Sequence, residues 1–388
     1  MTILLFLSNT DFPVHWLMRG VSQKAVALGW SLQTSEFREG PDGRYRLIRS
    51  PGGADLRGVL DFWRPDGCIV ECSGSPKLLG PSDFPGIPAV FVDRHPADVP
   101  EGTMCVYSDP APIARAAARE LMLLGYDHYA YVPCPGDDVW SRDRGEEFRQ
   151  LVRRTGKTVH SLPAELATSD APHFARTLEK WIGRLPRPCG VFVANDLAAE
   201  SVLLACSAMG LSVPEDVAVV GVDNAEYLCE NTHPTLSSVE RDLFGAGRIA
   251  AEMLDDALRH GRPAPSRPFG ITGLVRRASS RRVRTGDVRL ARALEFIRRR
   301  ACEGVSPPDV AAEMGVCRTL ADRLFRKNLG HTILDEIHEV RLEHAKALLH
   351  RHVGTSAVAD MCGYRSVSDF RRVFRARVGI SVKAFPSS

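Results

Sequence analysis

The C-terminal part of the chain carries one pattern twice, and this duplication constrains the fold more than any other feature. The stretch "VAAEMGVCRTLADRLFRKNLG" (310–330) matches "VADMCGYRSVSDFRRVFRARVG" (358–379). The offset between the copies is 48 residues up to a central Gly and 49 residues beyond it. A turn tolerates an inserted residue and a helix does not. Each copy is therefore predicted to be a short helix, a tight turn at Gly and a second helix.

The second helix of each copy is predicted to be amphipathic and basic. In the second copy, Phe370, Val373 and Phe374 share one helical face, and arginines occupy the other faces. A basic face on a single helix is usually only solvated, and a helical bundle for dimerisation or adaptor binding would also fit. The duplication, with Arg on the second helix both times, instead favours two recognition helices that contact nucleic acid.

Charge is divided unevenly along the chain. Residues 275–388 contain 23 Lys and Arg against 12 Asp and Glu, whereas residues 1–274 contain 27 against 35. The formal net charge of +3 therefore combines a strongly basic part with an acidic part. This asymmetry is typical of a polyanion-binding domain that is joined to a domain with another task.

A long predicted helix at 333–350 separates the two copies and would set their second helices about 34 Å apart, one turn of DNA. The motif "RLEHAKALL" (341–349) and the second copy resemble the AraC-family DNA-binding domain, over about 288–385. The resemblance implies an all-α domain of two helix-turn-helix units that binds double-stranded DNA at tandem half-sites. It also implies a homodimer and activation of transcription, with RNA polymerase as a further partner.

Positions in this resemblance assign outward-facing residues to DNA. The residues expected at base edges are Arg318, Thr319, Asp322 and Arg323 in the first copy and Arg365, Ser368, Asp369 and Arg372 in the second. Arg is the commonest partner of guanine, and Asp can accept from cytosine. Arg371 and Arg375 are assigned to phosphates.

Residues 1–275 alternate between apolar strand-like segments and amphipathic helix-like segments, a series predicted to close with the strand "VAVVGVD" (217–223). Such alternation predicts parallel sheets covered on both faces. About a dozen elements are too many for one small sheet. We therefore expect two α/β lobes with ligand space between their strand ends. The basic segment 276–287 is predicted to be a linker without core residues, followed by the all-α domain at 288–388.

Several motifs resemble the effector domain of LacI-type regulators and the periplasmic sugar-binding proteins. Residues 193–242 contain "VAND", "GLSVPEDV", "GVDN" and "PTLSSV", and "RGEEFRQLV" occupies 144–152. The resemblance covers nearly all of 2–275. It implies a two-lobed, type I periplasmic-binding-protein-like fold with a small sugar in its cleft.

Sugar hydroxyls need carboxylates, amides and Arg as hydrogen-bond partners, and aromatic rings cover the apolar sugar face. The residues expected to bind the ligand are Arg144, Asn195, Asp196, Asp223, Asn224, Trp140 and Trp16. Each has a plainer alternative: the aspartates as helix caps, Arg144 in a surface ion pair and the tryptophans in the core. Their joint placement at strand ends favours a ligand site.

The order of the domains narrows the function. LacI-type regulators carry their DNA-binding unit before the effector domain, whereas the predicted DNA-binding unit follows it here. That order, at this length, is similar to regulators of xylose catabolism, so a sugar such as xylose is the expected ligand, with its identity left open. An α/β enzyme using Asp196 and Asp223 is the alternative. No nucleotide-binding glycine motif, G-x-S-x-G motif or metal cluster accompanies those carboxylates, so neither enzymatic activity nor a cofactor is expected.

The compartment is also predicted from the sequence. The N-terminal "MTILLFLSNTDF" has no basic region before its short apolar run, which favours a buried strand over a signal peptide and disfavours a transport binding protein. No apolar stretch reaches 18 residues, so no membrane partner is expected. The ten cysteines form no C-x-x-C pair. Reduced, buried thiols in a cytoplasmic protein are therefore expected, rather than a zinc site.

Overall fold

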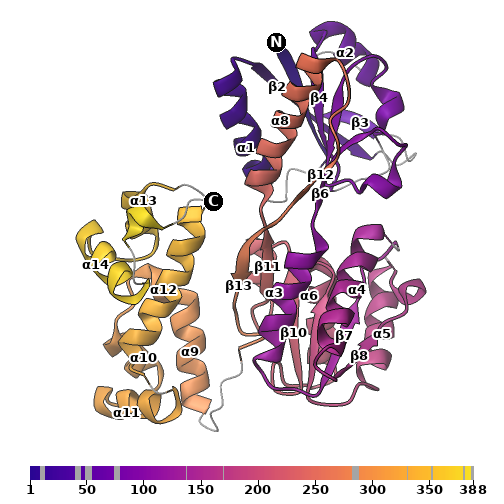
Figure 1. Ribbon diagram of the computed structural model, residues 1–388. Helices are drawn as coiled ribbons and strands as arrows, with labels where there is room; N and C mark the ends of the chain where they lie inside the picture. The colour runs from indigo at the N-terminus through magenta and orange to yellow at the C-terminus, as the bar shows by residue number, and fades with distance from the viewer. Residues whose placement is uncertain are drawn as a thin grey trace. The chain divides into compact units, whose positions relative to one another are not determined.

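The computed structural model divides into two compact units, Met1–Leu274 and Val275–Ser388 (Figure 1). It describes residues 1–8, 14–39, 45–48, 55–73, 79–136, 138–168, 170–281, 288–329, 331–350, 353–378 and 381–385. The first unit consists of two α/β lobes, each built on its own sheet, and the second is all helical. The predicted fold class is confirmed.

The first lobe is built on a seven-stranded sheet of order β12-β6-β5-β4-β1-β2-β3. Its strands are β1 (Thr2–Leu7), β2 (Ser31–Glu39), β3 (Tyr45–Ile48), β4 (Gly67–Glu71), β5 (Ala89–Val92), β6 (Met104–Ser108) and β12 (Arg267–Phe269). All pairings are parallel except β2 with β3. Its helices are α1 (Val14–Leu28), α2 (Leu56–Trp63) and α8 (Leu243–His260). A Cβ on Gly20 would lie 2.1 Å from the Phe244 carbonyl oxygen, so α1 and α8 pack with their backbones in contact.

The second lobe has a six-stranded sheet of order β13-β11-β10-β9-β7-β8. Its strands are β7 (His128–Val132), β8 (Thr158–Ser161), β9 (Cys189–Val193), β10 (Val217–Val222), β11 (Ser237–Arg241) and β13 (Ile271–Val275). Its helices are α3 (Pro110–Met122), α4 (Val139–Arg153), α5 (Ala171–Ile182), α6 (Asp196–Ala208) and α7 (Glu226–Cys229). Helices α5 and α6 pack into one apolar cluster, and α3 and α4 into another. Both faces of the sheet are therefore covered, as predicted.

Three chain segments connect the lobes, each with a single residue between flanking elements. They run from β6 to α3 through Asp109, from β11 to α8 through Asp242, and from β12 to β13 through Gly270. The segments are hydrogen-bonded together: Asp109 N donates to the Phe269 carbonyl at 2.8 Å, and Asp242 N to the Gly270 carbonyl at 3.0 Å. The prediction that the series closes with the strand at 217–223 is wrong, because β11, α8, β12 and β13 follow and complete both lobes.

The second unit consists of helices that pack around two apolar cores. Its elements are α9 (Val288–Arg300), a short 3-10 turn η5 (Ala301–Glu303), α10 (Pro307–Glu313), α11 (Arg318–Leu329), α12 (Ile333–His350), α13 (Thr355–Met361), α14 (Val367–Val378) and η6 (Val382–Ala384). Helix α12 contributes Ile337 and Val340 to the core of the first helix pair. It also contributes Leu342 and Ala345 to the core of the second. One helix thus fixes both pairs relative to each other.

The segment predicted to be a linker without core residues differs from that expectation. Ser279 and Ser280 are buried, and Arg281 forms an ion pair with Glu336 of α12. Residues 282–287 of that segment lie outside the described residues. All ten cysteines are free thiols, and most are buried. Among the described residues, no helix has the length and apolar character that crossing a membrane would need.

Candidate ligand site and nucleic-acid interface

Three charged side chains meet where strands of both lobes end. Asp93 follows β5 of the first lobe, and Asp223 and Arg241 lie at the ends of β10 and β11 of the second. The Arg241 Nη1 atom donates to both carboxylate oxygens of Asp93 at 2.7 Å, and its Nε lies 2.6 Å from Asp223 Oδ1. Burial alone would lower the pKa of Arg241, but the two carboxylates raise it above its usual value. The Arg241 guanidinium is therefore a fixed positive charge that joins the lobes.

The backbone at this cluster is strained. Asp93 has a φ of 62° and Asp223 a φ of 112°, and the following Asn224 has a φ of 51°. Non-glycine residues rarely adopt positive φ, and such conformations cost on the order of 1–3 kcal/mol each. Strain of this kind concentrates at functional sites, because the surrounding structure must be built to hold it. Three strained residues at two facing strand ends favour a binding function for this edge.

Arg144 lies beside this cluster, in the first half of α4. Its Nη1 donates to the Ala194 carbonyl at 2.7 Å and its Nη2 to Ser108 Oγ at 3.2 Å, while its buried Nε has no hydrogen-bond partner in the described part of the chain. The indole of Trp140 stacks on the guanidinium, with the Cζ atom 4.6 Å from the ring centroid. Burial, and then the nearby Arg241, lowers the pKa of Arg144. The unused Nε is a donor available to a ligand.

The two predicted asparagines have different roles. Asn195 caps α6 by accepting from Ala198 N at 2.9 Å, so most of its function is structural. Asn224 donates from Nδ2 to Glu240 Oε1 at 3.1 Å, and its buried Oδ1 has no partner among the described residues. Buried polar atoms without partners are rare. Asn224 Oδ1 therefore adds an acceptor at the same strand end as Asp223.

Asp196, which was expected to contact the ligand, is held by hydrogen bonds within its own lobe. Its carboxylate accepts from Ser238 Oγ at 2.6 Å, from Ala225 N at 2.9 Å and from Cys229 Sγ at 3.3 Å, and it is almost completely buried. Burial, followed by the charge of Asp223, raises the pKa of Asp196 to about 7. All these partners lie within the lobe. Asp196 therefore braces the loop that carries Asp223 and Asn224.

The two tryptophans also contribute to packing. Trp16 lies in the first turn of α1, packs against the core of the first lobe, and lies beside His15 with ring centroids 4.7 Å apart. Trp140 packs against the core of the second lobe, in addition to its contact with Arg144. The alternative of tryptophans in the core therefore describes Trp16, whereas Trp140 orients a residue of the candidate site. Residues 9–13, which precede α1 in the sequence, lie outside the described residues.

Sequence reasoning missed Asp93, Ser108 and Arg241. Asp93 directly follows the strand-like "AVFV", and Arg241 lies within "SSVERD". The position of Asp93 after an apolar strand was a usable signal, equal to the one that indicated Asp223. Nothing in the sequence indicated that Arg241 pairs with both carboxylates, because its partner Asp93 is 148 residues away.

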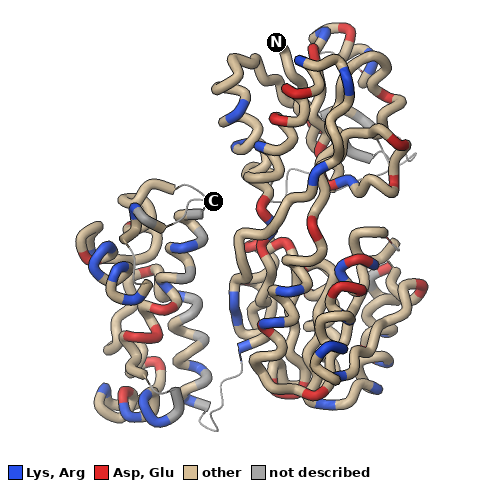
Figure 2. Tube along the Cα trace, in the orientation of Figure 1, with Lys and Arg blue, Asp and Glu red and all other residues tan. Residues whose placement is uncertain are grey.

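In the second unit, α11 and α14 carry all the residues that were assigned to DNA except Arg365, and Lys and Arg gather along both helices (Figure 2). Among the residues assigned to DNA, Asp322 and Asp369 are half-buried. The others are exposed: Arg318, Thr319, Arg323, Arg365, Ser368, Arg371, Arg372 and Arg375. Arg365 lies just before α14 rather than within it. Arg318 pairs with Asp322 at 2.8 Å and Arg372 with Asp369 at 2.5 Å. A base edge would have to compete with those carboxylates for the two arginines.

The turn between the helices of each pair requires Gly. Gly315 and Gly363 have φ values of 64° and 69°, in the left-handed region that residues with a Cβ avoid. Val310 and Val358 are fully buried at equivalent positions, as are Phe325 and Phe374. The duplicated pattern therefore encodes two copies of one structure.

Comparison with known families agrees with both units. Residues 106–280 match the model of a periplasmic binding protein-like domain, and residues 310–387 match a helix-turn-helix domain. The chain thus combines a periplasmic binding protein-like domain with an AraC-type helix-turn-helix domain, the composition of a DNA-binding transcription regulator. The regulator is 27% identical over 344 residues to the xylose operon regulatory protein of Escherichia coli K12, covering 85% of this chain and 87% of that protein. Its relatives are transcription regulators, not enzymes.

Two further similarities concern a second relative and solved structures. The xylose operon regulatory protein of Haemophilus influenzae is 28% identical over 256 residues, which is 63% of this chain and 64% of that protein. A solved xylose-binding transcription activator, XylR, superposes with a TM-score of 0.58 at 24% identity, covering 99% of this chain and 98% of that one. The regulator CelR with cellobiose superposes with a TM-score of 0.54 at 23% identity, covering 72% of this chain and 84% of that one. These structures share the fold.

Proposed function

We propose that the regulator senses a small sugar such as xylose and thereby controls genes of sugar catabolism, most simply as an activator. The observation that carries this proposal is the polar cluster at the strand ends of both lobes. It offers the Arg144 Nε donor and the Asn224 Oδ1 acceptor beside the Asp93–Arg241–Asp223 ion pairs. Small-molecule sites are recognised by a few convergent polar groups of this kind. The names of the relatives suggest xylose.

The mechanism follows from the position of this cluster. A ligand that binds at Asp93 and Asp223 contacts both lobes, so it stabilises one relative orientation of the lobes over others. Its hydroxyls would compete with Arg241 for the carboxylates. Binding therefore changes which contacts hold the lobes together. If the ligand binds one orientation of the lobes more tightly than another, it shifts the equilibrium toward that orientation.

On the DNA side, we infer that the two helix-turn-helix units of one chain bind successive major grooves at one half-site. A homodimer would then span tandem half-sites in the cytoplasm, where RNA polymerase is the partner of an activator. The base-edge roles are proposed for Arg318, Thr319, Asp322, Arg323, Arg365, Ser368, Asp369 and Arg372, and the phosphate roles for Arg371 and Arg375. The exposed arginines on α11 and α14 support these assignments.

The test combines ligand binding with DNA binding. Calorimetric titration of a panel of pentoses and hexoses should identify one sugar that binds, and Asp223→Asn should weaken that binding by at least about tenfold. DNase footprinting on the DNA upstream of its own gene should then show a protection that depends on the same sugar. Binding to DNA without a response to any sugar would leave a DNA-binding protein and remove the sensing function.

A further inference from the structure

The segment that joins the two units is attached to the DNA-binding unit at one defined point. Strand β13 ends at Val275, and Arg281 then forms an ion pair with Glu336, in the first turn of α12. Helix α9, the first helix of the unit, begins only at Val288. The chain is therefore held by α12 before it enters the helical unit through α9.

Glu336 is suited to hold this segment. It is fully buried, and each of its carboxylate oxygens has a cationic or hydrogen-bonding partner. Oε1 accepts from Arg281, and Oε2 lies 2.7 Å from His331 Nε2. Because an unpaired buried carboxylate is strongly destabilising, the ionised Glu336 side chain is stabilised in its buried position by the ion pair with Arg281.

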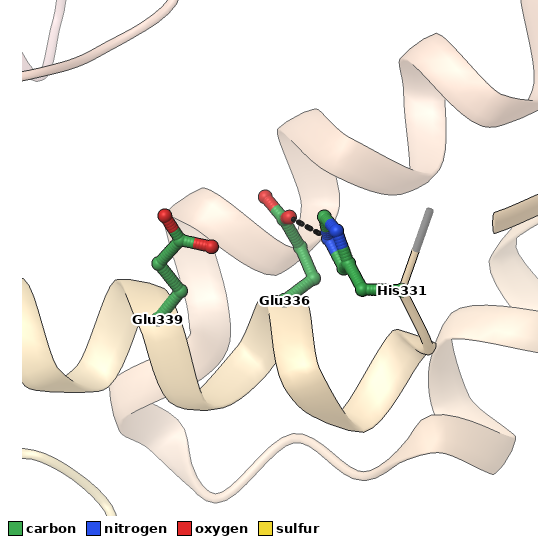
Figure 3. Close-up of side chains that lie close together, drawn as sticks. All are labelled: His331, Glu336 and Glu339. Atoms are coloured by element: carbon green, nitrogen blue, oxygen red, sulfur yellow. Dashed lines mark hydrogen bonds and ion pairs between the residues drawn. The ribbon is translucent and has the colours of Figure 1, made fainter. Parts of the chain in front are cut away.

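The same cluster fits an ion pair better than a metal site. His331, Glu336 and Glu339 have ligand atoms within 4.8 Å of one another, which is the only such group among the described residues (Figure 3). However, both oxygens of Glu336 already have partners, and the guanidinium of Arg281 would repel a cation. Glu339 is exposed and lies one turn further along α12. Arg281 supplies the positive charge that this cluster needs.

The first turn of α12 also contacts the second recognition helix. Asp335, next to Glu336 in the chain, pairs with Arg377 of α14. Asp335 is fixed by Thr332, whose N and Oγ1 donate to Asp335 Oδ2 at 2.9 and 2.7 Å. These hydrogen bonds, and then Arg377, hold the pKa of Asp335 well below its usual value. Two adjacent carboxylates therefore connect the joining segment on one side and α14 on the other.

We propose that the Arg281–Glu336 ion pair transmits the ligand-bound state of the first unit to the DNA-binding helices, through the first turn of α12. This inference rests on the proposed function, because it requires a ligand that acts on DNA binding. Any displacement of residues 276–281 moves Glu336 and therefore α12, the helix that contributes to both apolar cores of the second unit. It also acts through Asp335 on the position of α14. Residues 276–281 thus connect the end of β13 mechanically to α12.

The test measures coupling in the full-length protein. Xylose affinity is measured by calorimetry, and affinity for the protected upstream DNA is measured with and without saturating xylose. In Arg281→Ala, xylose affinity and ligand-free DNA affinity should stay within about twofold of wild type, while the effect of xylose on DNA affinity should fall to about twofold or less, against the roughly 5–150-fold typical of coupled sites. Glu336→Gln should behave likewise, since it removes the charge without leaving a carboxylate unpaired and so serves where Arg281→Ala folds poorly.

A matched control is available in the same unit. Arg292 pairs with Glu313 at 3.0 Å between α9 and α10, in an ion pair that involves neither Arg281 nor Glu336. Arg292→Ala should keep the full effect of xylose. If Arg281→Ala and Glu336→Gln both keep it as well, the proposed connection is wrong although sensing stands. If wild type itself shows no response to any sugar in the panel, both the sensing function and the connection are wrong.

Discussion

The two helix-turn-helix units share one sequence pattern but differ in what supports them. A Cβ on Gly315, in the first turn, would meet no atom of the described residues within 4 Å. A Cβ on Gly363, in the second turn, would lie 2.5 Å from the carbonyl oxygen of Cys302 in η5. The second helix-turn-helix therefore packs against the backbone that leads into the first helix-turn-helix, whereas the turn of the first is open. Duplicated sequence gave duplicated geometry, but the turn of the second copy packs against the backbone that precedes the first copy.

Arg341 of α12 strengthens this dependence. Its Nε donates to the Ala301 carbonyl at 2.8 Å and its Nη2 to the Val305 carbonyl at 3.0 Å, and its guanidinium lies 5.6 Å from the ring centroid of Tyr364. The arginine therefore donates hydrogen bonds to carbonyls just before the first helix-turn-helix and contacts an aromatic residue of the second helix-turn-helix. Substitutions that disturb η5 should therefore destabilise the second helix-turn-helix more than the first.

The largest expected effect comes from the glycines. Gly363→Ala combines a left-handed backbone with a steric clash and should destabilise the helical unit by about 3–5 kcal/mol, whereas Gly315→Ala meets only the backbone cost of about 1–2 kcal/mol. Thermal unfolding of the full-length variants, followed by circular dichroism, measures the difference. Equal effects of the two substitutions would show that the turns are equivalent after all.

Arg341→Met should destabilise the helical unit by about 2–4 kcal/mol, because two backbone carbonyls lose a charged donor. Hydrogen exchange followed by mass spectrometry should show faster exchange in α13 and α14 than in α10 and α11. Arg292→Ala is the control, since Arg292 pairs with Glu313 between α9 and α10 rather than with η5. Equally faster hydrogen exchange in both helix-turn-helix units would contradict the idea that only the second one needs this support.

The arginines of the recognition helices give a third test. Arg372→Ala should reduce discrimination between cognate and substituted sites by about 1–3 kcal/mol, because its proposed partner is a base edge. Arg375→Ala should weaken binding to all sequences alike and reduce the salt slope by about 1. Arg323→Ala asks the same question of the first unit. Loss of discrimination in Arg372→Ala alone would mean that only the second unit contacts bases in a sequence-specific way. The opposite assignment of Arg372 and Arg375 would mean that α14 lies differently in the groove.

The smallest effect concerns His338, whose ring stacks on Tyr364 with centroids 6.1 Å apart. Burial, and then the charges of Arg377 and Arg341, lowers the pKa of His338 in the folded protein. The folded state therefore favours the neutral ring. Its contribution to stability is complete above the unfolded pKa of about 6.5, and it is lost as the pH falls below that value towards the folded pKa. Urea unfolding at pH 7 and pH 5 should show this loss, and His338→Gln should reduce it.

The helical unit could be predicted from its sequence almost completely, because its signals are local. The duplicated pattern specified two turns at Gly315 and Gly363 and two buried phenylalanines, and a short repeat with 3.6-residue periodicity contains all of that information. The two-lobed α/β fold also followed from local alternation. What the pattern could not show was that α8 returns to the first lobe, because no local signal specifies which sheet a helix covers.

The candidate site was harder to predict for the same reason. Asp223 and Arg144 could be proposed for the candidate site because strand ends and helix starts are visible in the sequence. Arg241 was missed as a site residue because its role comes from pairing with Asp93 across the two lobes. The contacts of Asp196 with Ala225, Cys229 and Ser238 could not be predicted either, because they form only once the loop is folded.

The three connections between the lobes have a consequence for insertions and deletions. Each has one residue between its flanking elements, and backbone hydrogen bonds join neighbouring connections at Asp109 and Asp242. An added residue in any one would shift its register against the others and break those hydrogen bonds. The effector domain should therefore accept length changes at its outer loops but none at positions 109, 242 and 270. Where homologous sensors differ in length, the differences should leave this junction untouched.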